Sequence, residues 1–326
     1  MAAITLAEAK LNTLEDYDPA IIDEFRKHST LLNLMQFDKA VSPAGGGATL
    51  DYGYRRVKTE RNAQFRELNT EYPTEFATTE KVSVTLAPLG GAFEVDRVIA
   101  KLGPAASGEV AFQLRQLIKS TNAKFLDAVI NGDKAVDANG FDGLSKALLG
   151  STTELTDANF DWSAFSSSDQ SMTVLDHLDE LTGLLDGAPT VLFGNARALA
   201  KVRSAARRAS MYVKDPVQDL RWDNGNSVEV EKVGNLILID PGAKPGTNDP
   251  IIPVTGGLTD LYAVRLGLDG FHGVTTTDGN MLQTWLPDFT TAGAVKKGEV
   301  ELGPVAVALK ATKAAAVVRG VKVAAA

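Results

Sequence analysis

The sequence has no cysteine, and this absence removes two common ways of holding a chain together. A disulfide framework and a thiolate metal site both require cysteine. The fold must therefore be held by side-chain packing or by contacts with neighbouring subunits.

Histidine is scarce as well, with three residues, His28, His177 and His272. None of them has the HxH or HExxH spacing of a zinc site. The sequence also lacks a G-x-S-x-G elbow, a phosphate-binding loop and a G-x-G-x-x-G fingerprint after a strand. We therefore predict no catalytic residue, no cofactor and no metal.

An excess of positive charge is missing too, since 33 basic residues face 41 acidic residues and the formal net charge is -8. Domains whose main task is to bind nucleic-acid phosphates usually carry a basic excess, so this balance argues against that task. No run approaches the roughly 18 apolar residues of a membrane-spanning helix. The first ten residues lack the basic and apolar regions of a signal peptide. We expect no membrane partner.

The most informative feature that is present is a long hairpin within 44–96. Apolar residues alternate in 50–54 and again in 82–86, which predicts two strands, and a polar segment separates them. Charge is segregated along this hairpin, with basic residues first and acidic residues after them. The charged residues are Arg55, Arg56, Lys58, Arg61 and Arg66, then Glu67, Glu71, Glu75 and Glu80.

Two interpretations of this charge order remain open. The two arms of one hairpin could pair with each other in solvent. Alternatively, copies of the chain could dock side by side, basic arm against acidic arm, which would set register and reject wrong partners. On the second interpretation the nine charged residues are inter-subunit contacts. Gly45, Gly46 and Gly47, together with Gly90 and Gly91, are predicted to be the hinges of the hairpin.

A long helix is predicted at 107–131, because apolar residues recur there at steps of three and four. About 25 residues at 1.5 Å each give a rod of about 37 Å, which is long for a globular domain. Asn131-Gly132 is typical of a helix that ends in a left-handed residue.

The rest of the chain mixes helices and strands. The predicted helices cover 171–185 and 196–209, and the predicted strands cover 190–193, 236–239, 261–266, 300–302 and 305–323. The Pro- and Gly-rich segment 241–257 predicts an exposed loop. Because helices and strands do not alternate strictly, the predicted fold class is α+β. The basic 196–209 helix fits either a nucleic-acid contact or a solvated face that pairs with acidic neighbours.

The order of these parts resembles a known family. An arm, a long charged hairpin and a long helix ending in Asn131-Gly132-Asp133 precede Phe141-Asp142-Gly143-Leu144, as in the major capsid proteins of tailed bacteriophages. These proteins share the HK97-type fold, which is also found in encapsulin shells. The later segments Thr190 to Asn195, Leu236 to Pro241 and Ala315 to Gly320 are similar to the family as well. The resemblance runs from about Thr49 to Val323.

The resemblance implies a division of the chain. Residues 1–43 would be an N-arm and 44–96 an extended loop that lies over the adjacent subunit. Residues 97–189 and 296–326 would form a peripheral domain around the long spine helix. Residues 190–295 would form the axial domain, with the 241–257 loop facing the capsomer axis.

The resemblance also implies a function and partners. The chain would be a structural head protein that forms pentamers and hexamers, and these would close into an icosahedral shell around double-stranded DNA. It would be assembled in the host cytoplasm and end in the virion. Portal and decoration proteins would be partners, and DNA would meet the inner face without sequence specificity. The family pattern begins within roughly forty residues of Met1, so a separate scaffolding protein is implied if one is needed.

Some family members join subunits through a Lys–Asn isopeptide bond. Lys58 and Lys81 lie on the predicted loop and Asn280 lies in the predicted axial domain. Nothing in the sequence shows that these residues meet, so the sequence does not decide whether subunits are cross-linked.

Two other functions stay open at this point. An encapsulin-like nanocompartment would share the fold but enclose a cargo protein. A more remote alternative is an acidic hydrolase that uses scattered carboxylates with His177 or His272.

Overall fold

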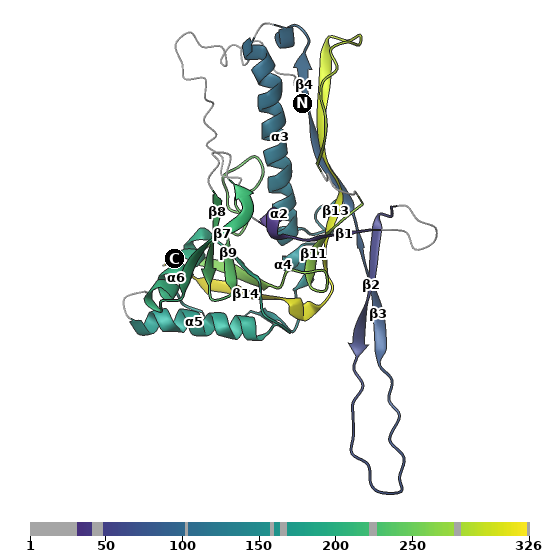
Figure 1. The fold of residues 1–326 in the computed structure, drawn as a ribbon, viewed down its shortest axis with the longest axis vertical. Coiled ribbons are helices and arrows are strands. Elements are labelled where there is room, and N and C mark those ends of the chain that lie inside the picture. The colour runs from purple at the N-terminus through teal and green to yellow at the C-terminus, as the bar shows by residue number, and fades with distance from the viewer. Residues whose placement is uncertain are drawn as a thin grey trace.

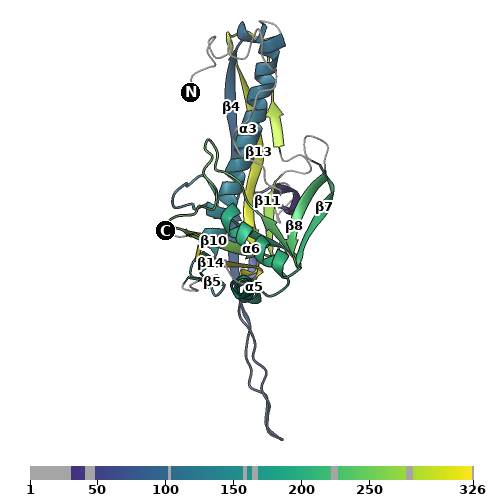
Figure 2. The same ribbon diagram turned by 90° about the vertical axis from the view of Figure 1, so that its left-hand side faces the viewer.

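The computed structural model describes residues 31–40, 48–101, 104–156, 160–163, 168–221, 227–276 and 282–324. Helices and strands are mixed along the chain, in agreement with the α+β prediction. A body of two sheets carries a long helix and a narrow ribbon of strands on one side. A two-stranded hairpin projects from the body in the opposite direction (Figure 1). The second view shows the same hairpin as a thin extension beyond the body (Figure 2).

The long helix is α3, Pro104–Asn131. It begins three residues before the predicted start, because Pro104 occupies the first helical position, where its missing N–H costs nothing. At 1.5 Å per residue its 28 residues span about 42 Å. Phe125 and Val129, from the predicted apolar stripe, are fully buried in the core. The prediction of one long amphipathic helix is therefore confirmed.

The end of α3 explains the glycines in its sequence motif. Gly132 does not have a positive φ, so the predicted left-handed helix end is wrong. A Cβ at Gly132 would instead collide with the carbonyl oxygens of Phe141 and Ala128, and a Cβ at Gly143 would collide with that of Ala128. The Gly143 amide donates to the Gly132 carbonyl at 2.9 Å. Two stretches of backbone touch here, and only glycine permits that approach.

One sheet has five strands and includes β13, Val295–Leu309, which crosses the molecule. Its strands are β1 (Phe37–Lys39), β11 (Phe271–Thr275), β13, β12 (Leu282–Trp285) and β4 (Ala87–Asp96). The predicted separation between 300–302 and 305–323 is wrong, because β13 continues through Pro304 as a bulge between Leu302 and Val305. A proline is tolerated at a bulge because no ladder donor is needed there.

The second sheet has seven strands in the order β5-β14-β10-β6-β9-β8-β7. Their bounds are Glu154–Leu155, Ala315–Lys322, Leu258–Val264, Val191–Gly194, Leu236–Ile239, Ser227–Val233 and Tyr212–Arg221. Strand β14 pairs with β10, so the 315–322 segment joins the sheet of the predicted axial domain rather than the sheet that holds β13. The predicted domain division otherwise stays a prediction.

Helices α5 (Ser168–Gly183) and α6 (Ala196–Arg208) pack on each other beside this second sheet. The shorter helical elements are α2 (Leu31–Leu34), η1 (Ile99–Lys101), α4 (Leu144–Ala147) and η2 (Thr312–Ala314). The 241–257 segment is a loop as predicted, but it is exposed only in part. Its first residues, with Ala243, and the pair Ile251 and Ile252 are buried, while 246–250 and most of 253–257 are exposed.

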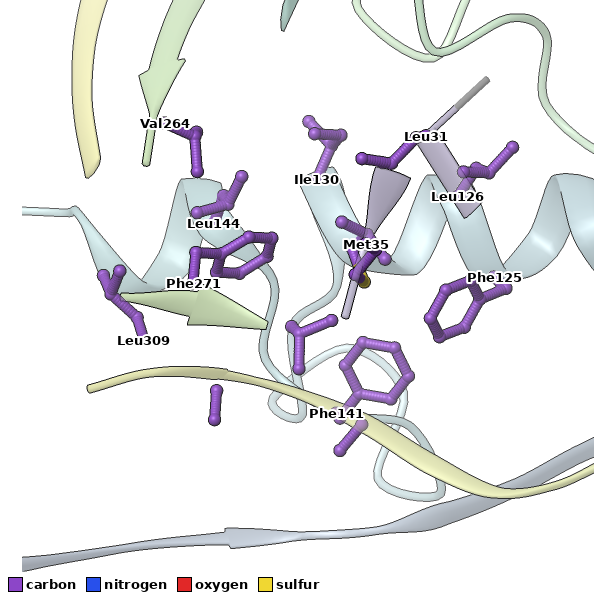
Figure 3. Packing of buried hydrophobic residues seen from close by; sticks show 14 of the residues in the cluster. Leu31, Met35, Phe125, Leu126, Ile130, Phe141, Leu144, Val264, Phe271 and Leu309 are labelled. Carbon is purple, nitrogen blue, oxygen red and sulfur yellow. The ribbon is translucent and has the colours of Figure 1, made fainter. Parts of the chain in front are cut away.

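The main core lies where α3 ends against the sheets. Leu31 and Met35 of the N-terminal segment pack there with Phe125 and Ile130 of α3 and with Phe271 of β11 (Figure 3). These side chains are at most 5% exposed. The last part of the predicted arm is therefore held by the chain's own core. Residues 1–30 of that arm lie outside the described residues.

The projecting hairpin consists of β2 (Asp51–Thr59), β3 (Thr78–Thr85) and the loop 60–77 between them. It pairs Asp51 with Thr85 and Tyr54 with Val82. The predicted extended loop reached Asp96, but β4 already belongs to the five-stranded sheet through its pairing with β13.

The structure gives Gly90 and Gly91 a role other than the predicted hinge. Both lie inside β4 and pair with Glu301 and Val300 of β13. A Cβ at Gly90 would collide with the Val300 carbonyl oxygen, and one at Gly91 would lie 2.6 Å from Leu117 Cδ1 of α3. These glycines let strand and helix pack closely, and the ladder fixes them. Gly45, Gly46 and Gly47 lie outside the described residues, so their role as hinges stays a prediction.

Candidate assembly interface

The hairpin is the most exposed structure in the described chain. Tyr52, Tyr54 and Arg56 on one face of β2 are partly buried, while Gly53, Arg55 and Val57 on the other face are exposed. This alternation follows from the period of two in a strand. Only the root of the hairpin therefore contacts the body.

The loop 60–77 is stabilised by its own contacts. The Asn62 amide donates to Glu75 Oε2 at 2.9 Å, which joins the two sides of the loop. Arg66 Nη1 donates to the carbonyls of Glu67 and Thr70, at 3.1 Å each. The Arg66 guanidinium also lies over the Tyr72 ring, 5.1 Å from its centroid.

Apolar side chains on this loop point into solvent. Phe65 is fully exposed, Leu68 is 89% exposed and Phe76 is 84% exposed. Burying a Phe or Leu side chain stabilises a protein by about 1.5–3 kcal/mol, and the single chain gains none of this at the loop. A cluster of exposed apolar side chains on a projecting element is typical of a contact with another surface.

The root of the hairpin is fixed by a set of polar contacts, here called the root cluster: Asp38, Tyr52, Tyr54, Arg56, His272 and Lys310. The Tyr52 hydroxyl donates to Asp38 Oδ2 at 2.5 Å, and the Tyr54 hydroxyl donates to the Leu309 carbonyl at 2.8 Å. Arg56 Nε donates to the Lys310 carbonyl at 2.8 Å, and its Nη2 donates to the Leu309 carbonyl.

In the root cluster, hydrogen bonds and a nearby cation stabilise the partly buried carboxylate of Asp38. Lys310 Nζ lies 3.6 Å from Asp38 Oδ2 and 5.4 Å from the centroid of the Tyr52 ring. Burial raises the pKa of Asp38, but the hydrogen bonds from Tyr52 and the Lys39 amide outweigh burial and lower that pKa below its usual value. Burial and the Asp38 carboxylate raise the pKa of Tyr52, which keeps its hydroxyl a donor.

The predicted contact residues divide into two groups in the structure. Arg56 bonds to the body of its own chain, and its predicted inter-subunit contact stays a prediction. Arg66 and Glu75 bond within the loop. The remaining side chains are exposed, and the described part of the chain offers them no ion pair: Arg55, Lys58, Arg61, Glu67, Glu71 and Glu80.

The cross-strand register explains why the arms do not neutralise each other. Arg55 lies opposite Lys81, so two like charges meet across the ladder. Arg56 lies opposite Glu80, but its guanidinium is turned to the body. The two strands pair through their backbones, but the charged side chains of the described arms form no ion pair across the ladder. Both interpretations of the charge order stay open. Whether another copy supplies the partners stays a prediction.

The root cluster was missed by sequence reasoning. Tyr52 and Tyr54 were identified only as alternating strand residues. Their partners Asp38 and Leu309 are 14 and 255 residues away, and no local pattern marks such a contact.

His177 and His272 are both packed against aromatic side chains of the chain. Trp162 Nε1 donates to His177 Nδ1 at 3.0 Å, and the His177 ring stacks on Phe160 with 3.9 Å between centroids. His272 is fully buried in β11 under Tyr52. His28 and Asn280 lie outside the described residues.

Helix α6 uses part of its basic charge within the chain. Arg203 Nη1 lies 2.6 Å from Glu231 Oε2, and the Arg207 guanidinium lies over the Tyr212 ring. Arg197 is exposed, and its amide is capped by the Asn195 side chain. The open alternative of a nucleic-acid contact therefore has fewer unpaired cations than the sequence suggests.

The described residues show neither a candidate metal site nor a candidate membrane-spanning helix. No group of three His, Cys, Asp or Glu side chains there is placed to hold a metal ion. Among the helices in the described ranges, none combines the length and the apolar character needed to cross a membrane.

This protein resembles known proteins in its structure but not in its sequence. No family model matches the sequence, and no curated protein matches it. The structure is similar to the encapsulin SrpI complex of Synechococcus elongatus, with a TM-score of 0.60 and 15% identity over 99% of this chain and 97% of that one.

Capsid structures match over similar lengths. The capsid of a native GTA particle gives a TM-score of 0.55 and 13% identity over 100% of both chains. The capsid of Myoviridae phage XM1 gives a TM-score of 0.56 and 14% identity over 98% of this chain and 100% of that one. At such identities the similarity shows the fold, and the chain has the HK97-type fold. The predicted fold is confirmed.

Proposed function

We propose that the chain is the major capsid protein of a tailed double-stranded DNA bacteriophage, which assembles into pentamers and hexamers of an icosahedral shell. The observation that carries this proposal is the hairpin, where most of the charged side chains find no ion pair within the described chain and where Phe65, Leu68 and Phe76 are exposed. Such a surface suits a head-to-tail contact in which each copy gives its hairpin to the next. Contacts of this kind close into rings when the rotation between copies allows it.

The fold supports the proposal, since the chain shares its architecture with two capsids and a nanocompartment shell over nearly its whole length. The virion location, assembly in the host cytoplasm, and the scaffolding, portal and decoration partners belong to the same proposal. So does non-specific contact with packaged DNA on the inner face. The division into N-arm, extended loop, peripheral and axial domains is proposed on the same ground.

The first test is negative-stain electron microscopy of the full chain with sedimentation velocity on the same sample. Closed shells, tubes or five- and six-membered rings are expected. A monomer or dimer that never assembles, even when a scaffolding protein is supplied, would contradict the proposal.

Charge reversal tests the hairpin contact itself. Reversing two charges in one arm (Arg55→Glu with Arg61→Glu) or in the other (Glu71→Arg with Glu80→Arg) removes the net charge of that arm, and each variant alone should fail to assemble. A mixture of the two variants should co-assemble, because each supplies the charge that the other lacks. Lys134→Glu, an exposed residue beyond α3, is the matched control and should assemble normally. Normal assembly of both reversed variants would contradict this contact.

An encapsulin-like nanocompartment is the second candidate, and the TM-score of 0.60 with an encapsulin supports it. The contents of the shell distinguish the two functions. Particles purified from the native source should contain double-stranded DNA if the chain is a capsid protein, and a single enriched cargo protein if it is a nanocompartment. The hydrolase alternative has no support in the geometry, because His177 and His272 are packed into structural contacts.

A further inference from the structure

His272 has an unusual environment at the root of the hairpin. The side chain is completely buried, and neither ring nitrogen makes a hydrogen bond of normal geometry in the described part of the chain, although the backbone of Gly267 and Gly270 lies near the ring. Buried polar groups are normally hydrogen-bonded, and an unpaired one costs about 1–3 kcal/mol. The neutral ring tolerates this position, whereas a charged ring would not.

The hairpin contacts His272 through one aromatic ring. The Tyr52 ring of β2 meets the His272 ring edge-on, with 5.9 Å between centroids and an interplanar angle of 80°. Tyr52 stays in place because its hydroxyl donates to Asp38. The ring that covers His272 therefore also ties the hairpin to the N-terminal segment.

The charged and titratable groups around His272 come from three elements. Asp38 of β1 is the carboxylate, Lys310 after β13 is the cation, and Tyr52 of β2 is held neutral. Burial and Lys310 lower the pKa of His272, while Asp38 and the nearby backbone of Gly270 and Gly267 oppose them in part. A protonated His272 would have two N–H donors and Lys310 beside it, and Asp38 is already engaged by Tyr52 and Lys310.

We propose that His272 makes the attachment of the hairpin to the body sensitive to acid, because the protonated ring favours a conformation in which Tyr52 has moved away. Movement of Tyr52 admits water to the imidazolium and frees Asp38 to accept from it. Both changes remove contacts that fix β2. The device lies within one chain, so it does not depend on the proposed shell function.

The direction of the pH effect follows from linkage. In the attached state the pKa of His272 is lowered from its usual value of about 6.5. Release of the hairpin takes up a proton, so acid favours release below about pH 6.5. The ratio of released to attached hairpin should grow by up to about tenfold per pH unit, until the attached state also binds the proton.

The absence of cysteine makes the test direct, since labels can be placed at two chosen sites. Spin labels on Ser83→Cys in the hairpin and Asp179→Cys on α5 both occupy exposed positions outside the root cluster. Labelled full-length chain, diluted with unlabelled chain, is measured by pulsed electron resonance between pH 7.5 and 5.0. The distance distribution should be narrow at pH 7.5 and should broaden reversibly with a midpoint below about 6.5.

Two variants separate His272 from other acid effects. His272→Phe cannot be protonated and fills the same buried site. In this variant the distribution of distances between the two spin labels should be the same at pH 7.5 and at pH 5.0. His272→Gln is a smaller neutral substitute if the phenyl ring does not fit. His177→Gln, at a distant histidine, should keep the wild-type response. The proposal is overturned if the His272 variants broaden like the wild type, or if the wild type does not respond down to pH 5.0.

Discussion

At the scale of single residues, close backbone approach decides what the chain tolerates. Gly132 and Gly143 lie where the end of α3 meets the segment that leads to α4, and their amide and carbonyl groups bond directly. A side chain at either position would have to displace a carbonyl oxygen, which cannot rotate away as a flexible side chain can. The glycines of this motif are thus packing residues.

Gly143→Ala should destabilise the chain by about 1–3 kcal/mol, because overpacking forces the backbone apart. The matched control is Gly183→Ala at the end of α5, where a Cβ would meet nothing within 4 Å. That substitution should leave stability unchanged or raise it slightly. Urea unfolding of both variants checks the prediction, and equal stabilities would contradict it.

His177 gives stability a dependence on pH. Burial lowers its pKa from the usual value, although Glu180 and Asp176 oppose this, so the unfolded chain binds the proton first as pH falls. The folded state should therefore lose stability as pH falls below about 6.5 and level off once the folded pKa is passed. His177→Gln can still accept from Trp162 but cannot titrate. The loss in free energy of unfolding between pH 7.5 and 5.0, measured by urea unfolding, should be smaller in this variant than in the wild type.

At the scale of elements, Arg319 of β14 joins four parts of the body. Its Nε donates to Glu154 Oε1 of β5 at 2.8 Å, and its Nη1 donates to Ser145 Oγ of α4 at 2.8 Å. The same Nη1 lies 3.2 Å from Asp260 Oδ2 of β10. The planar fork of a guanidinium reaches these partners together, which an ammonium cannot do.

Arg319→Lys should destabilise the body by about 1–3 kcal/mol, since partly buried partners are left without donors. Lys322→Ala removes a more exposed ion pair, with Asp161 at 3.1 Å in the same strand region, and should cost less than about 1 kcal/mol. Thermal unfolding of both variants is the measurement. A larger loss for Lys322→Ala than for Arg319→Lys would show that this ordering is wrong.

At the scale of the whole molecule, the body folds around its own core while the hairpin loop stays outside it. Replacing 60–77 with Asn-Gly would close the ladder at Thr59 and Thr78 with a tight turn. The shortened chain should unfold at nearly the wild-type temperature, because the loop contributes little to the core. It should sediment as a small species under conditions in which the full chain assembles. Shell formation by the shortened chain would contradict the proposed role of the loop.

Much of this architecture could be predicted from local patterns in the sequence. Periodicity identified α3, α6 and both strands of the hairpin, because each is a continuous segment with one period. Contacts between distant segments could not be predicted in this way. The pairing of β14 with β10, and the bond from Tyr54 to Leu309, depend on how the sheets come together.

The role of Gly90 and Gly91 also could not be predicted from the local sequence. Gly-Gly pairs are typical of hinges in a single sequence, but the same pair also lets a helix pack against a strand. Gly91 lies against Leu117, which is distant in the chain, and only the assembled fold distinguishes the two roles.

The direct continuation of β3 into β4 has a mechanical consequence. Leu86 alone separates the hairpin from the strand that pairs with β13 from Ala87 to Asp96. A pull on the hairpin therefore loads this ladder along its length, in shear, so that its hydrogen bonds share the force and must fail together. By the same geometry the root cluster, with a few side-chain bonds, would yield before the ladder does. Tension between neighbouring subunits would thus turn the hairpin about its root before it tore the sheet.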